Sequence, residues 1–132
     1  MRKSLLIIVL SACGISMFAQ EEWKVPEKAR SLKSSFSLDE EKMILKGEKI
    51  FGKTCWTCHG EEGKGDGAAA ELLDPKPADL SSEMVQQQSD GALFWKITEG
   101  RGNMVGYEQM LSDEQRWQLV AFIRSLAQNE EE

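Results

Sequence analysis

The chain has 132 residues, of which 41% are hydrophobic and 29% are charged, and its formal net charge is −6 at pH 7. This length and composition suit one small soluble domain. The acidic balance argues against nucleic acid and anionic membrane surfaces as partners, because both carry negative charge. A partner with a basic face is allowed, although net charge alone does not locate a docking patch.

Residues 1–19 are typical of a removable export signal peptide. Arg2 and Lys3 form its positive end, an apolar stretch extends from Leu5 to Phe18, and Ala19 is a small residue at the expected cleavage site. The apolar stretch is too short for a comfortable membrane span. Cleavage would remove two basic residues and no acidic residue, so the net charge would change from −6 to −8. We therefore expect an exported, periplasmic protein.

Two alternatives for the leader stay open. Leu10-Ser11-Ala12-Cys13 resembles a bacterial lipoprotein cleavage box, which would leave Cys13 lipidated and the protein anchored to the membrane on its periplasmic side. An uncleaved leader would instead serve as an N-terminal anchor. In both cases the protein meets the membrane only through this segment.

Residues 20–36 are mixed in charge and show no clear period. They predict a linker or a loosely docked extension, in which Trp23 and Phe36 could pin parts of the segment. The expected role is that of a tether rather than a binding segment.

A first long helix is predicted from Ser37 to about Lys53. Ser37 and Glu40 match a capping box, with serine at the start and glutamate three residues later. Gly47 weakens a helix unless close approach is needed there, and a second helix crossing at this point would be such a reason. The face expected to pack comprises Met43, Gly47, Ile50, Phe51 and Thr54. Lysines 42, 46, 49 and 53 lie on another face, interpreted as solvated, with an electrostatic landing patch as the alternative.

This helix is followed directly by Cys55-Trp56-Thr57-Cys58-His59. A Cys-x-x-Cys-His motif is typical of c-type haem attachment. Two thiols three positions apart lie on about one helical turn, so each can add to a vinyl group of the porphyrin. The adjacent His59 is then held under the iron as its proximal ligand. The motif therefore predicts one haem c, bound covalently through Cys55 and Cys58.

Three other interpretations of the motif explain less. A zinc site wants four ligands, but the chain has three cysteines and one histidine in total, and Cys13 lies in the leader. A thioredoxin-like redox pair needs a βαβ pattern around it, whereas the flanking segments are expected to be helical. A structural disulfide leaves His59 unexplained.

Two loops and a short helical stretch are expected after the motif. Residues 60–67 contain four glycines and predict a loop with several left-handed positions, rather than a phosphate cradle. Residues 68–73 are expected to form one or two helical turns. Residues 74–80 predict an extended turn, because Pro75 and Pro77 each disfavour helix in the preceding residue. A proline carbonyl there could accept the ring N–H of His59 and fix the orientation of the imidazole.

Three more helices are predicted towards the C-terminus. A short one is capped by Ser81 or Ser82 and reaches residue 88, and the next begins at Ser89 or Asp90 and stops before Gly100. The last runs from 112 to about 128, with Ser112 and Gln115 as a second capping box. It is apolar over more than half of its circumference, so we expect burial on two sides. Residues 129–132 form an acidic tail.

The second axial ligand is expected to be a methionine, because the chain has one histidine. Met104 is the main candidate, since it lies in a loop bracketed by Gly102 and Gly106 that can bring its backbone close to the haem. Met43 is expected in the core and Met110 under the last helix, while Met84 suits either core or surface. An open or water-bound iron is the alternative.

These features resemble the class I c-type cytochromes over roughly Leu38 to Ala127. The resemblance rests on Gly47, Phe51, the motif at 55–59, Gly63-Lys64-Gly65-Asp66-Gly67, Pro75-Lys76-Pro77, and Met104 before Leu111-Ser112-Asp113-Glu114. It implies a small all-α domain over 37–128 wrapped around one covalent haem, with thioether bonds from Cys55 and Cys58. It also implies axial ligation by His59 and Met104. Val105 follows Met104 where most members have proline.

The resemblance implies two further structural roles. The first and last helices of the family cross near a glycine and an aromatic residue, roles for which Gly47, Phe51, Trp117 and Phe122 are available here. Trp95 and Arg101 are candidates for hydrogen bonds to the haem propionates. For both residues a core or surface position is an equal alternative.

The expected function is one-electron transfer. Iron with both axial positions filled by His59 and Met104 needs no substrate site, and a methionine ligand raises the reduction potential. The protein is then a carrier rather than an enzyme, and its partners are a respiratory complex, a dehydrogenase or a reductase. The alternatives are a haem protein whose distal ligand yields to peroxide or a gas, and a fixed haem subunit of a larger oxidoreductase complex.

Overall fold

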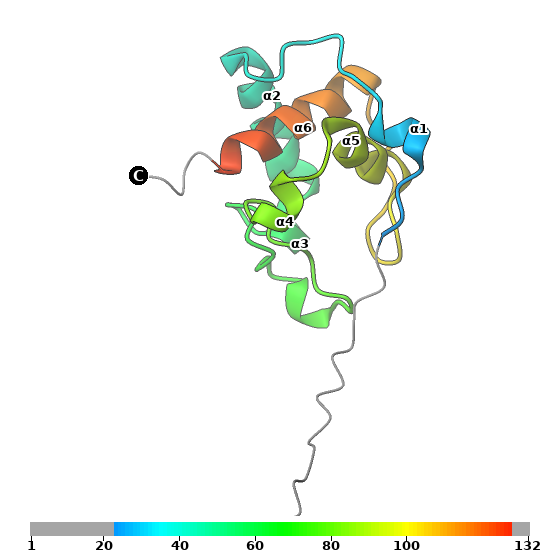
Figure 1. Ribbon diagram of the computed structural model, residues 1–132. Helices are drawn as coiled ribbons and strands as arrows, with labels where there is room; N and C mark the ends of the chain where they lie inside the picture. The colour runs from blue at the N-terminus through cyan, green and yellow to red at the C-terminus, as the bar shows by residue number, and fades with distance from the viewer. Residues whose placement is uncertain (1–22, 128–132) are drawn as a thin grey trace, which may run out of the picture.

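The computed structural model describes residues 23–127, so the expected signal peptide, Cys13 and the acidic tail lie outside the described part. Within it the chain is all-α, and a single isolated bridge pairs Arg101 with Met104. The helices, shown in Figure 1, are α1 (Glu27–Arg30), α2 (Glu41–Thr54), α3 (Trp56–His59), the 3-10 turn η1 (Ala70–Leu72), α4 (Glu83–Gln86), α5 (Asp90–Glu99) and α6 (Asp113–Leu126). None of the helices described is long and apolar enough to cross a membrane.

Helices α2 and α6 cross at Gly47, as the sequence predicts (Figure 1). A Cβ atom at this position would lie 2.0 Å from the backbone oxygen of Gln118 and 2.9 Å from Cβ of Phe122. One turn further along α2, the rings of Phe51 and Phe122 pack with centroids 5.0 Å apart. The absence of a side chain at Gly47 is therefore what allows the two backbones to meet.

The main core lies along this crossing and is closed by α5. Leu119, Val120 and Ala121 on α6 are at most 1% exposed, in keeping with the expected burial of this helix on two sides. Trp117 of α6 faces α5. Its ring stacks on Phe94 of α5, with centroids 4.2 Å apart and an angle of 17° between the planes.

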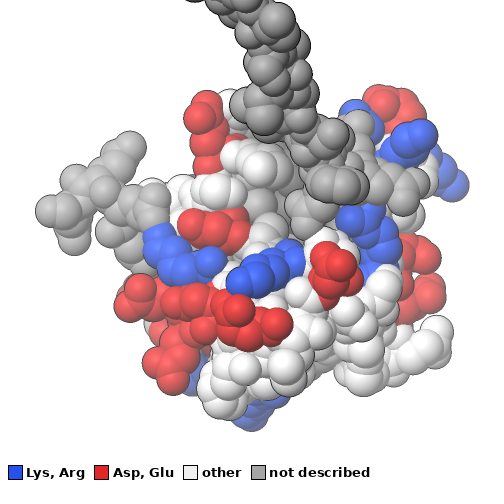
Figure 2. Space-filling view, turned by 90° about the horizontal axis from the view of Figure 1, so that it is seen from below, with Lys and Arg blue, Asp and Glu red and all other residues white. Residues whose placement is uncertain are grey.

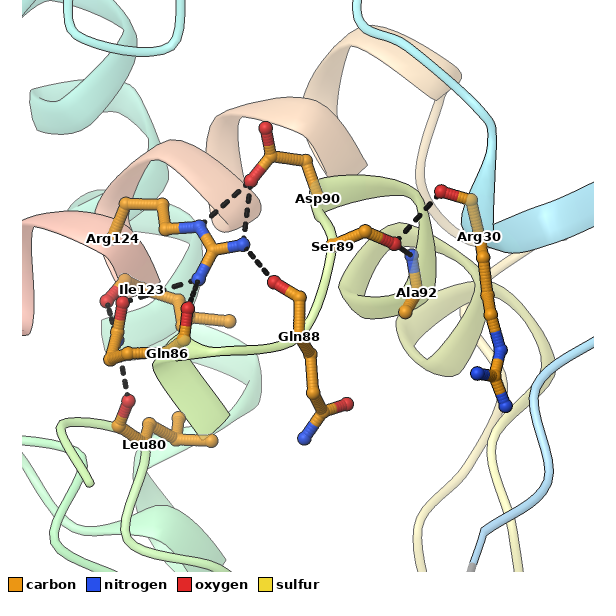
Figure 3. A network of polar contacts seen from close by, with 9 residues as sticks. All are labelled: Arg30, Leu80, Gln86, Gln88, Ser89, Asp90, Ala92, Ile123 and Arg124. Carbon is orange, nitrogen blue, oxygen red and sulfur yellow. Dashed lines mark hydrogen bonds and ion pairs between the residues drawn. The ribbon is translucent and has the colours of Figure 1, made fainter. Parts of the chain in front are cut away.

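Arg124 joins α6 to the short helix α4 and to the start of α5 (Figure 3). Its guanidinium lies 2.7 Å from a carboxylate oxygen of Asp90 and donates to the backbone oxygens of Gln86 and Gln88. The side-chain amide of Gln86 donates in turn to the carbonyls of Leu80 and Ile123. The bonds from Arg124 satisfy carbonyls at and just after the end of α4. This helix has four residues and is too short to be stable alone.

The helix ends follow capping chemistry at α5 and α6 but not at α2. Ser89 accepts from the backbone of Ala92, and both bonds of the predicted box between Ser112 and Gln115 are present. The box predicted at Ser37 is wrong: the Ser37 hydroxyl donates to the Asp39 carboxylate at 2.8 Å, and α2 begins after Glu40 without a side-chain cap. The Ser37 hydroxyl, which was expected to cap the helix, is hydrogen-bonded to the carboxylate of Asp39 instead.

Residues 23–32 form a packed segment rather than a free linker. Val25 and Ala29 are buried together with Ala92, and Trp95 packs against them, in a cluster separate from the main core. Gly91 permits the close approach, because a Cβ atom there would lie 2.3 Å from the carbonyl oxygen of Ala29. The start of the chain that is described is therefore part of the folded domain.

We predict that Gly47→Ala destabilises the protein by about 1–3 kcal/mol, the usual cost of overpacking, because neither backbone can move without disturbing the core. Gly52→Ala is the matched control, since nothing lies within 4 Å of a Cβ atom built at that position of the same helix. The control should be neutral, or stabilising by up to about 1 kcal/mol. The measurement is urea unfolding of both variants, and equal free energies of unfolding for the two would contradict the role given to the crossing.

Candidate functional site

The Cys-x-x-Cys-His motif begins at Cys55, directly after the last residue of α2, and continues through α3. Cys55 ends α2 with its amide donating to the carbonyl of Phe51 at 2.9 Å. Its own carbonyl accepts from the amides of Cys58 and His59 at 3.2 and 3.0 Å, which closes the single turn of α3. Both cysteines are free thiols and half-buried. Two thiols and an imidazole thus lie within one turn, as the spacing predicts.

The glycine-rich loop at 60–67 folds back onto the backbone of this turn. The amide of Gly65 donates to the carbonyl of His59 at 2.7 Å, and the amide of Gly67 donates to that of Cys58 at 3.1 Å. Gly67 has no room for a side chain, because a Cβ atom there would lie 2.4 Å from the carbonyl oxygen of Thr57. The carbonyls at the end of α3, which a helix leaves without partners, are satisfied in this way.

The ring of His59 is oriented by the extended segment that follows. Its Nδ1 atom lies 3.4 Å from the carbonyl oxygen of Ala78. The sequence predicted a proline carbonyl for this role, but the acceptor belongs to the residue after Pro77. Burial lowers the pKa of His59, with the carbonyl of Ala78 acting in the opposite direction. The imidazole is thus held neutral with Nδ1 turned towards a carbonyl, and Nε2 is the nitrogen that remains for a metal.

A polar latch of Lys64, Asp79 and Ser81 holds the segment that contains Ala78. The hydroxyl of Ser81 donates to the carboxylate of Asp79 at 2.6 Å and accepts from the ammonium of Lys64 at 2.9 Å. The amide of Leu80 donates to the carbonyl of Gly63 at 2.7 Å. The hydrogen bond from Ser81 is the main cause of a lowered pKa for Asp79. The glycine loop and the segment behind His59 are thereby tied together.

The loop that contains Met104 is attached at three places. Arg101 and Met104 exchange backbone hydrogen bonds of 2.8 and 3.0 Å. The amide of Tyr107 donates to the carbonyl of Ile97 on α5 at 2.9 Å. The hydroxyl of Tyr107 donates to the carbonyl of Thr54 at 2.7 Å, directly before Cys55. Tyr107 is therefore the tie between this loop and the motif.

Burial raises the pKa of Tyr107, and the nearby Cys55 adds to this effect. A raised pKa extends to higher pH the range over which the phenol is protonated, the form that donates to the carbonyl of Thr54.

The environments of the four described methionines differ. Met43 is 5% exposed in the main core, as expected. Met84 and Met110 are 78% and 59% exposed, so the expectation that Met110 packs under the last helix is wrong. Met104 is half-buried in its loop. Of these side chains, only that of Met104 combines partial burial with a loop tied to the motif.

Trp95 and Arg101, the candidates for propionate contacts, both face Trp23. The rings of Trp95 and Trp23 meet edge-on with centroids 6.3 Å apart, and the guanidinium carbon of Arg101 lies 4.9 Å from the centroid of Trp23. Sequence reasoning gave Trp23 no role beyond pinning the extension. The sequence feature that could have indicated its contacts is a tryptophan in a mostly polar segment, because a tryptophan side chain is usually largely buried.

The residues present fit a covalently bound haem. Two free thiols and a neutral, oriented imidazole on one turn are the donor set that haem c requires, and the half-buried Met104 offers a soft second ligand. No cluster of three or more histidine, cysteine, aspartate or glutamate side chains within residues 23–127 suits a metal ion. The two cysteines and one histidine of the motif are also one ligand short of the four that a structural zinc site requires.

The fold and this donor set define a small all-α domain of the c-type cytochrome class. A family model for cytochrome c matches residues 44–127, which is more than half of the chain. The chain belongs to the cytochrome c family, and the family implies haem c and electron transfer.

A solved structure with a similar fold is a chain of the reducing HAO-like protein complex of Kuenenia stuttgartiensis. The two are 29% identical with a TM-score of 0.61, and the match covers 75% of this chain. It covers 52% of the other chain, so this protein spans about half the length of that relative.

We predict that Asp79→Asn removes an acid-sensitive part of the stability. Because the pKa of Asp79 is lowered in the folded state, its contribution is complete above the ordinary value of 3.8 and is lost as the pH falls through the folded value. The variant should therefore be less stable than the wild type at pH 5. The difference should shrink as the pH falls below 3.8 and the wild-type carboxyl takes up its proton. Urea unfolding at several pH values measures this, and a difference independent of pH would refute it.

Proposed function

We propose that this protein binds one haem c through Cys55 and Cys58 and transfers single electrons between redox proteins. The observation that carries the proposal is the geometry at one helical turn: two free thiols beside an imidazole whose Nδ1 lies 3.4 Å from a carbonyl oxygen. When bound, the haem supplies a one-electron couple between ferrous and ferric iron. Electron transfer of this kind forms and breaks no bond in the protein.

Each residue of the site has a separate task. Cys55 and Cys58 would form the thioether bonds, and His59 would offer Nε2 to the iron while the carbonyl of Ala78 orients its ring. Met104 offers its sulfur as the other ligand from a loop that Tyr107 ties to Thr54. With His59 and Met104 both bound to the iron, no coordination position would be left for a substrate, which supports a carrier rather than an enzyme.

The partners are proposed to be other redox proteins in the periplasm, such as a respiratory complex, a dehydrogenase or a reductase. The net charge of −6 disfavours nucleic acid and anionic lipid. The face seen in Figure 2 carries acidic side chains next to basic ones and an area without charged residues, so charge of one sign does not cover it. Export rests on residues 1–19, and lipidation of Cys13 or retention of the leader are the alternatives for membrane attachment.

A second candidate function is that of a fixed haem subunit in a larger complex. The structural relative named above comes from a protein complex, and this chain covers about half of that relative. The two candidates differ in how the native protein is isolated. A freely diffusing carrier elutes at the size of one small domain, whereas a fixed subunit stays with its partners through purification.

We predict that replacing both Cys55 and Cys58 by alanine abolishes covalent haem attachment, because no thiol of the motif remains to form a thioether bond. The measurement is the mass of the denatured protein after maturation with haem, which should fall to that of the polypeptide alone. A serine substitution at Thr57, inside the same turn, should leave the attachment intact. Covalent haem in the double variant would refute the assignment of the motif.

We predict that Met104→Ala leaves the haem attached but lowers the midpoint potential, because a methionine ligand favours the ferrous state. Axial ligands tune haem potentials over roughly 0.8 V, so the change should be easily measurable by redox titration. Met84→Ala and Met110→Ala are matched controls on exposed methionines and should leave the potential unchanged. An unchanged potential in the Met104 variant would transfer the ligand role to another residue.

A further inference from the structure

Trp23, at the start of the described chain, contacts the root of the Met104 loop. The guanidinium carbon of Arg101 lies 4.9 Å from the centroid of the Trp23 ring, and the ammonium of Lys96 lies 5.2 Å from it. The ring of Trp95 meets it edge-on at 6.3 Å. One tryptophan therefore gathers two cations and a second aromatic ring, from the end of α5 and the residues directly after it.

The segment that carries Trp23 is itself held firmly on α5. The hydroxyl of Ser89 donates to the carbonyl of Arg30 at 2.8 Å, as Figure 3 shows, and Arg30 donates back along its own segment to the carbonyl of Val25 at 3.1 Å. Ala29 approaches Gly91 closely enough to exclude any side chain there. Because the segment behind Trp23 is packed against α5, the Trp23 ring is held in place and can restrict the movement of Arg101.

Arg101 connects this contact to the proposed axial ligand. Its backbone exchanges two hydrogen bonds with that of Met104, at 2.8 and 3.0 Å. Gly100, at the root of the same turn, has a φ of 66° and leaves no room for a Cβ atom, which would lie 2.4 Å from the carbonyl oxygen of Met104. A displacement of Arg101 must therefore displace Met104.

We propose that Trp23 is a positioning residue for Met104: by holding the guanidinium of Arg101, the N-terminal segment keeps the Met104 loop closed over the haem. This inference rests on the proposed function, in which Met104 is the second axial ligand. It gives residues 23–32 a role in setting how readily the metal is exposed, in place of the tether expected from the sequence.

The energetic argument is that, beyond the hydrogen bonds that attach it, the Met104 loop is restrained by little apolar burial. Val105 is 55% exposed, and Met104 is only half-buried, so little apolar burial opposes opening. Each cation on an aromatic face adds enough to change an opening equilibrium roughly two- to fivefold at an exposed site. Of the two cations, Arg101 belongs to the loop, so loss of its contact with Trp23 should raise the open population by about two- to fivefold.

The test is cyanide binding to the ferric, haem-loaded protein, followed by absorbance. Cyanide can bind only where Met104 has left, so its apparent dissociation constant reports the open fraction of the loop. Trp23→Ala should lower that constant by about two- to fivefold. Trp23→Phe keeps an aromatic face and should restore part of the difference. Phe36→Ala removes a ring of the same N-terminal region that lines a separate hollow with Phe94 and Trp117, and it should leave cyanide binding unchanged.

A double-variant cycle separates positioning from a loss of stability. In the Met104→Ala background, Trp23→Ala should no longer change cyanide affinity, because no loop ligand remains to be displaced. If Trp23→Ala does not alter binding to the protein that has Met104, or alters it equally in both backgrounds, the positioning role is overturned. If the wild type binds cyanide as tightly as Met104→Ala does, the ligand role of Met104 fails and the present inference fails with it.

Discussion

The contact between Gly47 and the backbone of Gln118 is the constraint on which the rest of the structure depends. It brings α2 against α6 without an intervening side chain, and the ring of Phe51 then packs on Phe122 one turn later. Cys55 follows one helical turn after Phe51. The crossing therefore determines where the side chains of Cys55, Cys58 and His59 lie in the fold. The haem-binding turn is therefore positioned by helix packing rather than by the loops around it.

The loops around the haem-binding turn hold the two proposed axial ligands. The latch of Lys64, Asp79 and Ser81 holds the carbonyl of Ala78 beside His59, whereas Tyr107 ties the Met104 loop to the carbonyl before Cys55. These are separate tethers on the two proposed axial ligands. A cytochrome c domain whose ligands are both supplied and held by the chain can change oxidation state with little rearrangement, which is the property that an electron carrier needs.

Much of this arrangement was predictable from the sequence where local chemistry decides the outcome. Ser89 and the pair Ser112 and Gln115 cap their helices as expected, and Gly47 marks the crossing because a glycine inside a helix needs a reason. The prediction failed where a residue had a choice of partners. Ser37 bonds to Asp39 instead of capping α2, and the carbonyl beside His59 comes from Ala78 rather than a proline. The docking of Trp23 on Arg101 depends on tertiary contacts that no periodicity reveals.

The most direct test of the central claim is the absorption spectrum of the haem-loaded protein in the ferric and ferrous states, with and without carbon monoxide. If His59 and Met104 fill both axial positions, the spectrum is low-spin in both states, the ferric form shows a weak far-red band from the methionine sulfur, and carbon monoxide does not bind. A high-spin spectrum with rapid binding of carbon monoxide would contradict the account, and ligand or peroxide chemistry would then become the leading function.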